Sequence, residues 1–171
     1  MHINTKSDSM NFTNELDGCS EFSCIFRLVK IAVESLMGKR RAGLLLGLTK
    51  LPNYIGAFHQ LGSNFIIMNK TLLEKVIETE DKELINAYIF HVLLHEYIHS
   101  LGYINEQETQ ILTHKISERV LGLNHPATLI ARYGLGSVLS GLKINHADRI
   151  EKIDKIEIIN DFENENLNYF G

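Results

Sequence analysis

The spacing of apolar residues predicts where the first helix lies. Phe22, Ile25 and Val29 recur three or four residues apart, and this spacing predicts a helix from about Glu21 to Met37. Residues 1–20 are rich in Ser, Asn and Asp and show no such period, so we expect a loose arm there.

Further helices are predicted by the same period together with residues that favour helix ends. Asn69 and Asp81 are of types that cap helix N-termini, and Gly102 is a helix-ending residue. Pro126 marks a break in the chain. We expect helices up to Ile77, from Lys82 to Leu101, from Glu106 to Leu121, and over residues 128–142.

Short apolar runs between turn residues predict the strands. Ala42–Leu48 is bounded by glycines and is expected to be a buried strand, while Tyr54–Phe58 and Asn64–Met68 flank a turn at Gly62 and predict a β-hairpin. A further strand is expected at Lys155–Ile159. The order of these elements predicts an α+β fold, one domain over residues 1–171 with a short mixed sheet of three to four strands packed on helices and loose ends at 1–20 and 160–171.

Composition narrows the functional classes. Hydrophobic residues make up 44% of the chain and charged residues 22%, the balance of a soluble globular protein, and the formal net charge of -4 gives no electrostatic reason to expect nucleic acid. The first residues are polar, and apolar runs fall short of the roughly 20 residues of a membrane span, so we expect no membrane and a cytoplasmic protein. Cys19 and Cys24 have no second pair to complete a metal site and are interpreted as reduced thiols.

The segment Tyr88–Gly102, YIFHVLLHEYIHSLG, carries the candidate chemistry. This helix is apolar around most of its circumference, which predicts that it is buried and that its polar residues have a role. His95 and His99 are four residues apart, so a helix stacks their imidazoles on one face, close enough to share one tetrahedral zinc ion. Glu96 lies beside that position.

This HExxH arrangement suits zinc-dependent hydrolysis. Zinc lowers the pKa of a bound water to about 7, and the glutamate takes up the proton as the water attacks a carbonyl. The simpler interpretation is a pair of surface histidines beside a solvated glutamate, but the apolar neighbours Leu94 and Ile98 favour a buried metal site. We therefore predict Zn²⁺ as the cofactor, His95 and His99 as ligands and Glu96 as the catalytic base.

A third ligand is expected from the next helix. The inner face of that helix is predicted from its apolar residues, Leu112, Ile116, Val120 and Leu123. Glu108 lies one turn before Leu112 on nearly that face, where a carboxylate is costly unless it binds a cation, so Glu108 is the predicted ligand. Glu106, on the side of Thr113 and Ser117, is the alternative.

His95, Glu96, His99 and Glu108 resemble the pattern of the zincin metallopeptidases of the gluzincin type, in which a glutamate ligand follows HExxH on the next helix. Residues 42–121 are similar to a minimal zincin core of the kind found in small single-domain gluzincins. The resemblance implies a peptidase in which an edge strand, here Asn64–Met68, pairs with an extended peptide or protein substrate. The chain departs from the family in the short separation between His99 and the glutamate ligand.

Other interpretations stay open beside the peptidase. The same site would serve a zinc-dependent nuclease or amidase, and a regulatory protein with structural zinc would need a fourth ligand such as His91, His114 or a cysteine. His91 lies one turn before His95 and is expected to make a core or supporting hydrogen bond. His125 and Tyr133 are candidates for stabilising an oxyanion, although structural roles are favoured for both.

Overall fold

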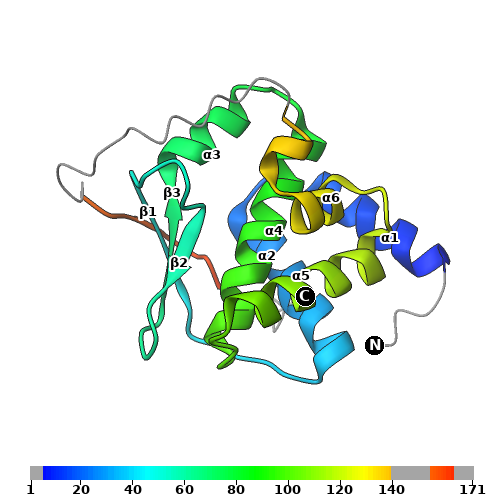
Figure 1. Cartoon of the computed structure of the whole chain (residues 1–171), viewed down its shortest axis with the longest axis horizontal. Coiled ribbons are helices and arrows are strands. Elements are labelled where there is room, and N and C mark those ends of the chain that lie inside the picture. The colour runs from blue at the N-terminus through cyan, green and yellow to red at the C-terminus, as the bar shows by residue number, and fades with distance from the viewer. Residues whose placement is uncertain (1–5, 140–154, 164–171) are drawn as a thin grey trace.

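A computed structural model describes residues 6–139 and 155–163, which form an α+β fold (Figure 1). The helices are α1 (Lys6–Gly18), α2 (Phe22–Met37), α3 (Lys70–Ile77), α4 (Lys82–Ser100), α5 (Glu106–Leu121) and α6 (Pro126–Tyr133), followed by the 3-10 turn η1 (Leu135–Ser137). The strands are β1 (Leu45–Thr49), β2 (Ala57–His59), β3 (Phe65–Asn69) and β4 (Glu157–Ile159). The predicted fold class is confirmed.

Side-chain caps fix the helix starts that the sequence predicted. Asn69 accepts a hydrogen bond from the Thr71 N–H at the start of α3, and Asp81 accepts one from the Leu84 N–H at the start of α4. The chain then turns through Gly102, whose φ of 101° is a conformation that favours glycine. This turn lets α5 fold back against α4.

The strands form one mixed sheet in the order β2-β3-β1-β4. β1 and β3 are parallel, whereas β2 pairs antiparallel with β3 and β4 antiparallel with β1. The hairpin and the strand near Lys155–Ile159 are therefore confirmed. The expectation that Asn64–Met68 is the edge strand is wrong, because β3 has a neighbour on both sides and the edge beside it is β2.

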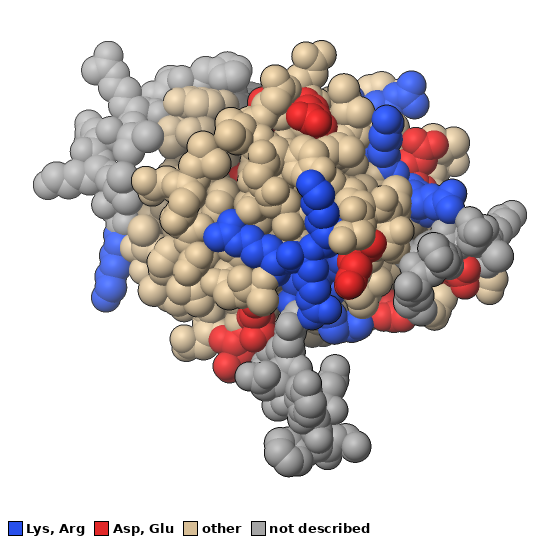
Figure 2. Space-filling view, turned by 90° about the horizontal axis from the view of Figure 1, so that it is seen from below, with Lys and Arg blue, Asp and Glu red and all other residues tan. Residues whose placement is uncertain are grey.

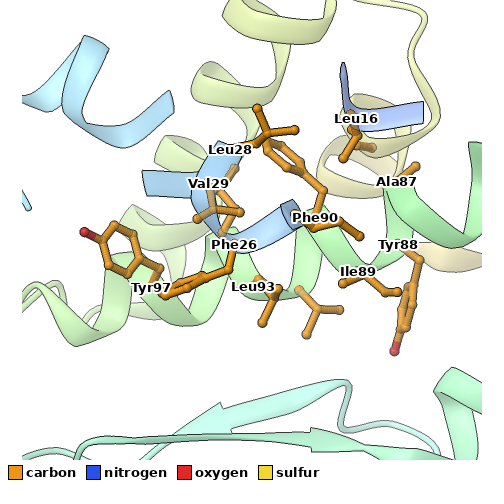
Figure 3. Packing of buried hydrophobic residues seen from close by; sticks show 14 of the residues in the cluster. Leu16, Phe26, Leu28, Val29, Ala87, Tyr88, Ile89, Phe90, Leu93 and Tyr97 are labelled. Atoms are coloured by element: carbon orange, nitrogen blue, oxygen red, sulfur yellow. The ribbon is translucent and has the colours of Figure 1, made fainter. Parts of the chain in front are cut away.

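Helix α4 lies at the centre of the molecule, with the sheet on one side and α2, α5 and α6 around it (Figure 1). Its apolar side chains supply much of the core, and Phe90 and Leu93 lie beside Phe26 and Val29 of α2 (Figure 3). A helix in this position is surrounded by protein over nearly its whole length, which explains why its sequence is apolar on all sides.

The expected loose arm at residues 1–20 is wrong from residue 6 onward. Phe12 and Leu16 of α1 are buried, and the Asn86 side-chain amide of α4 donates to the carbonyls of Leu16 and Cys19 at 2.8 and 2.9 Å. Cys19 and Cys24 form a disulfide between α1 and α2, so the expectation of reduced thiols is also wrong. The helix α1 has only three apolar residues, Met10, Phe12 and Leu16, and their spacing gave too weak a period to predict it.

The other end of the chain also differs from expectation. α6 ends at Tyr133 because Gly134 takes a φ of 88°, so the single helix expected over residues 128–142 is wrong as far as residue 139. Phe162 is buried and stacks on Phe26 with ring centroids 4.2 Å apart, so the expected loose tail does not begin at residue 160. The remainder of that tail, 164–171, lies outside the described residues.

No helix in the described residues is a candidate for spanning a membrane. None of their helices combines the length and the apolar composition that a bilayer crossing requires.

Candidate metal centre

Two histidines on the last turns of α4 face the same point. His95 and His99 are one turn apart, their ring centroids are 4.9 Å apart, and both side chains are largely buried. The helix stacks both rings on one face, as the sequence predicted, and this face lines a cavity.

A carboxylate from α5 meets both imidazoles. Glu106 places Oε1 2.7 Å from His95 Nε2 and Oε2 2.9 Å from His99 Nε2. Among the described residues, these three side chains form one of two groups whose ligand atoms lie within 4.8 Å of one another. Glu108 belongs to neither group, so the structure favours the alternative ligand Glu106 and corrects the choice of Glu108.

The rotation of α5 explains this correction. Its face toward the interior carries small hydroxyl residues, Thr109, Thr113 and Ser117, each of which has no exposed surface. Glu106 lies three and seven residues before two of them, so it continues this stripe at the helix start. Glu108 lies on the exposed side at the third helical position, where its backbone N–H is capped by Asn105 at 2.9 Å.

The hydrogen bonds of His99 leave its Nε2 lone pair facing the Glu106 carboxylate. Nδ1 of this ring lies 2.6 Å from the Tyr103 carbonyl oxygen, and a carbonyl only accepts, so the proton sits on Nδ1. Nε2 of a neutral ring then turns a lone pair toward the Glu106 carboxylate, and two electron-pair donors this close need a proton or a metal ion between them. Burial lowers the pKa of neighbouring His95, although Glu106 acts in the opposite direction, which disfavours the proton there. The donor set therefore fits a zinc ion.

Glu96 lies between the two histidines in sequence and is 6% exposed. Burial raises the pKa of this carboxyl to about 7 with a further contribution from Glu106, while His99 and a hydrogen bond from the His59 backbone act to lower it. A carboxyl poised near neutrality can both accept and return a proton.

The edge strand β2 forms one wall of the site. A cavity of about 280 Å³ lies among β2, the end of α4 and the start of α5. Its lining residues are Ala57, Phe58, His59, Leu61, His95, Glu96, His99, Ile104 and Glu106. His59 was not predicted from the sequence, because its contribution to Glu96 is made by a backbone N–H that carries no side-chain signal.

A second, larger cavity of about 440 Å³ adjoins the same three residues, His95, Glu96 and Glu106. It extends from them along α4 to Tyr88, between the loop before β2 and the end of α6. The candidate metal centre thus lies where two cavities meet, and its Glu106 side chain is 71% exposed. A solute can reach it from outside.

The other group with ligand-like geometry consists of Asp17, Glu83 and His125. Nδ1 of His125 accepts the Ala127 N–H at 3.2 Å, which places the ring proton on Nε2. A protonated nitrogen donates a hydrogen bond and does not bind a metal, so this group is a weaker candidate. The ring caps α6, which agrees with the structural role favoured for His125.

The remaining sequence candidates lie outside the centre. Tyr133 is 63% exposed and contacts Arg132, and neither cavity includes it. The His91 ring centroid is 6.3 Å from that of His95, and His91 lines the larger cavity. The two cysteines are bonded to each other, so neither is available as a thiolate ligand.

The basic side chains lie away from the two cavities. Figure 2 shows Lys and Arg side chains gathered on the lower face of the molecule, where the segment between α2 and β1 runs in Figure 1. The described lining of the two cavities contains no Lys or Arg. A polyanionic substrate would therefore meet glutamates at the centre and no paired cations.

Comparisons with known proteins identify no relative. No family model matches the chain, and no curated protein or solved structure matches it. Any assignment of activity therefore depends on the geometry of the site.

Proposed function

We propose that this protein is a zinc-dependent peptidase of the HExxH type, related in design to the gluzincins. The observation that carries the proposal is the convergence of His95 Nε2, His99 Nε2 and the Glu106 carboxylate beside the buried Glu96. Three protein ligands with a neighbouring carboxyl and open space are the arrangement of catalytic zinc sites, since structural sites are closed by a fourth ligand.

The chemistry divides between the metal and the chain. Zinc in this site would supply a Lewis acid that polarises a carbonyl and lowers the pKa of water. Glu96 takes a proton from the attacking water and delivers it to the leaving amine, a role that suits a carboxyl whose pKa burial has raised to about 7. The positive charge of a bound metal would lower that pKa again, which favours the base form at the start of the reaction. The Tyr103 carbonyl orients His99 through Nδ1.

Strand β2 supports an extended peptide as the substrate. The Gly56 carbonyl accepts the Asn69 N–H at 2.8 Å, so by strand alternation Ala57 and His59 turn their backbone groups away from β3. The hydrogen bond from the His59 N–H to Glu96 agrees with this orientation. The backbone groups of Ala57 and the His59 carbonyl, which face away from β3, can pair with a peptide laid beside β2 over the centre.

Two alternative functions are less well supported. A nuclease would need cations for phosphates, and the described cavity linings have none. A structural zinc protein would need a closed fourth position, and the centre instead opens to two cavities through an exposed Glu106. An amidase acting on a small substrate would use the same residues and is separated from a peptidase only by the substrates hydrolysed.

The test combines zinc content with hydrolysis of a mixed peptide library, in the wild type and three variants. Glu96→Gln is expected to keep about one zinc per chain and lose hydrolysis by 10²-fold or more, because only the base is removed. Glu106→Gln is expected to lose both zinc and hydrolysis. Glu108→Gln is the matched control, an exposed glutamate two residues away, and should keep both.

Each result has a distinct meaning. A wild type that binds no zinc would overturn the metal centre, and an active Glu96→Gln variant would overturn the role of the base. Loss of zinc in Glu108→Gln but not in Glu106→Gln would return the third ligand to its sequence-based assignment. Zinc binding with hydrolysis of small amides but of no peptide would favour the amidase.

The proposal also includes the cellular compartment in which the protein works. The polar first residues favoured the cytoplasm, whereas the Cys19–Cys24 disulfide favours an oxidising compartment, because cytosolic thiols are kept reduced. The disulfide is the stronger argument. Alkylation of free thiols in freshly lysed cells of the native host distinguishes the two, since two alkylated cysteines per chain would support the cytoplasm.

A further inference from the structure

The larger of the two cavities has a mixed lining in which apolar side chains from several elements face uncharged polar ones. Residues of α3, α4, α5, α6 and the loop before β2 surround it, with Asn53 and Gln110 among its polar side chains, and it adjoins His95, Glu96 and Glu106. Its apolar lining residues include Ile55, Leu72, Val92, Ile130 and Leu135. This space adjoins the proposed metal centre, so a substrate side chain next to the scissile bond is close enough to enter it.

Two buried polar atoms belong to residues that line this cavity. The Tyr88 hydroxyl and His91 Nδ1 are both buried, and neither has a hydrogen-bond partner. The Tyr88 side chain is directed away from the apolar cluster and toward the strands (Figure 3), and a Cβ built on Gly56 of the facing loop would lie 3.8 Å from its hydroxyl. Buried polar atoms are costly without a partner, so these two atoms are suited to meet one that enters with a ligand.

The charges around the cavity limit what can enter. Its described lining has no Lys or Arg, and its only carboxylates, Glu96 and Glu106, lie at the metal centre. A carboxylate tip would find no cation, and an ammonium or guanidinium tip beside Tyr88 and His91 would be buried without an anion. The lining therefore fits an uncharged side chain that is apolar along its length and polar at its end.

We propose that this cavity selects a substrate residue next to the scissile bond whose side chain is uncharged, largely apolar and tipped by a hydrogen-bonding group, with tyrosine as the best fit. Tyr88 is the specificity-determining residue, because its hydroxyl can both donate to and accept from that group. This inference rests on the proposed peptidase function. It goes beyond that function by naming the substrate class.

Discrimination of this kind is expected to be strong. A site built around unpaired hydrogen-bonding groups rejects a ligand that lacks the matching group, since its own polar atoms then stay unpaired. Tyrosine and phenylalanine differ only in the hydroxyl, so they isolate this effect from size and apolar surface.

The experiment uses the zinc-loaded full chain and peptides that differ at one position, carrying Tyr, Phe or Lys there, with cleavage sites mapped by mass spectrometry. For the wild type, kcat/KM is expected to be at least tenfold higher for Tyr than for Phe and lowest for Lys. Tyr88→Phe should bring the ratio of Tyr to Phe close to one. Tyr133→Phe, the same change at an exposed tyrosine outside both cavities, should keep the wild-type ratio.

The two proposals fail in different ways. If the zinc-loaded wild type cleaves no peptide, the peptidase and the inference both fall. If it cleaves the Tyr and Phe peptides equally, or if Tyr88→Phe retains zinc and leaves the ratio unchanged, the specificity inference is wrong while the peptidase stands. Efficient cleavage beside Lys would overturn the requirement for an uncharged side chain.

Discussion

At the scale of single residues, His125 links protonation to stability. The residue is 7% exposed, and Nδ1 accepts the Ala127 N–H at 3.2 Å to cap α6. Burial lowers the pKa of this imidazole to about 4 from its ordinary value of 6.5. Protonation of Nδ1 would also remove the cap. Folding therefore favours the neutral ring for two reasons.

The first prediction is a loss of stability between pH 6.5 and pH 4 that His125 causes. In this range the unfolded chain binds a proton at residue 125 that the folded chain does not, so the free energy of unfolding falls as the pH falls. The contribution is fully present above pH 6.5, and about 2 kcal/mol of it is lost by pH 4.5. Urea unfolding of the metal-free protein at pH 7 and at pH 4.5 measures it.

The control replaces the ring and keeps the cap. His125→Asn can still accept the Ala127 N–H but does not titrate in this range, so its free energy of unfolding should fall by about 2 kcal/mol less than that of the wild type. Other titrating groups, His91 among them, contribute to both proteins and cancel in the difference. An equal loss in the two proteins would show that His125 is not held neutral.

Residue spacing predicted the α4 side of the candidate site but not its α5 side. His95, Glu96 and His99 lie on one helix, so a period of 3.6 residues is enough to place them together. The choice between Glu106 and Glu108 depends on how α5 is rotated against α4. Of the apolar residues that suggested the inner face, Ile116 and Val120 are buried, but Leu123 is exposed and the buried face is shifted toward Thr109 and Thr113. Hydroxyl residues that bond within their own helix, as Thr113 does to the Thr109 carbonyl at 2.8 Å, carry no hydrophobic signal.

At the scale of elements, the Cys19–Cys24 disulfide closes the short connection between α1 and α2 and limits its freedom in the unfolded chain. The second prediction is that the double variant Cys19→Ser, Cys24→Ser loses about 2 kcal/mol of free energy of unfolding, the value expected for a cross-link that closes so short a loop. Guanidinium unfolding of the two proteins under non-reducing conditions measures it.

A measurement of peptide hydrolysis should show whether the double variant loses only stability or also the proposed active site. No described residue of α1 or α2 lines either cavity, so the double variant is expected to keep its zinc and its kcat/KM at temperatures where it is folded. Addition of a reducing agent to the wild type should reproduce the loss of stability. A drop in zinc content in the folded variant would contradict this separation and tie α1 to the metal centre.

The elements that the sequence predicted well have strong local signals. α3, α4 and α5 begin after Asn69, Asp81 and Asn105, each of which accepts a backbone hydrogen bond from the first turn. The edge position of β2 has no such signal, because strand order is set by pairings between segments far apart in the chain. The parallel pairing of β1 with β3 covers β3 on its second side and leaves β2 at the edge.

At the scale of the whole molecule, one arginine ties the sheet to the helix that carries the centre. The Arg41 guanidinium donates to the Ser100 carbonyl at the end of α4 and to the Ser63 carbonyl in the turn between β2 and β3, at 2.7 and 3.0 Å. Its backbone N–H donates to the Tyr97 hydroxyl at 2.8 Å. These bonds hold the turn of the hairpin against the end of α4, so β2 stays beside the candidate metal centre. The cavity between β2 and α4 therefore depends on the packing of the sheet against the helices.

The last prediction follows from this dependence on the complete fold. The proposed ligands come from two helices, and the unfolded chain does not hold His95, His99 and Glu106 together, so zinc binds the folded state and stabilises it. With zinc at about 100 times its dissociation constant the gain is about 2.7 kcal/mol, which for a chain of this length raises Tm by roughly 5 to 10 °C. Thermal unfolding with a chelator and with added zinc measures the difference.

Variants at the start of α5 show whether the zinc-dependent rise in Tm comes from the proposed ligands or from zinc bound elsewhere on the protein. Glu106→Gln should unfold at nearly the same temperature with and without zinc, because two imidazoles alone bind the ion more weakly, while Glu108→Gln should show the full wild-type shift. Glu96→Gln should show it too, since Glu96 is assigned to proton transfer and not to binding. A wild-type Tm that zinc leaves unchanged would mean that the three side chains converge for structural reasons alone, with a shared proton between His95 and Glu106 in place of the metal.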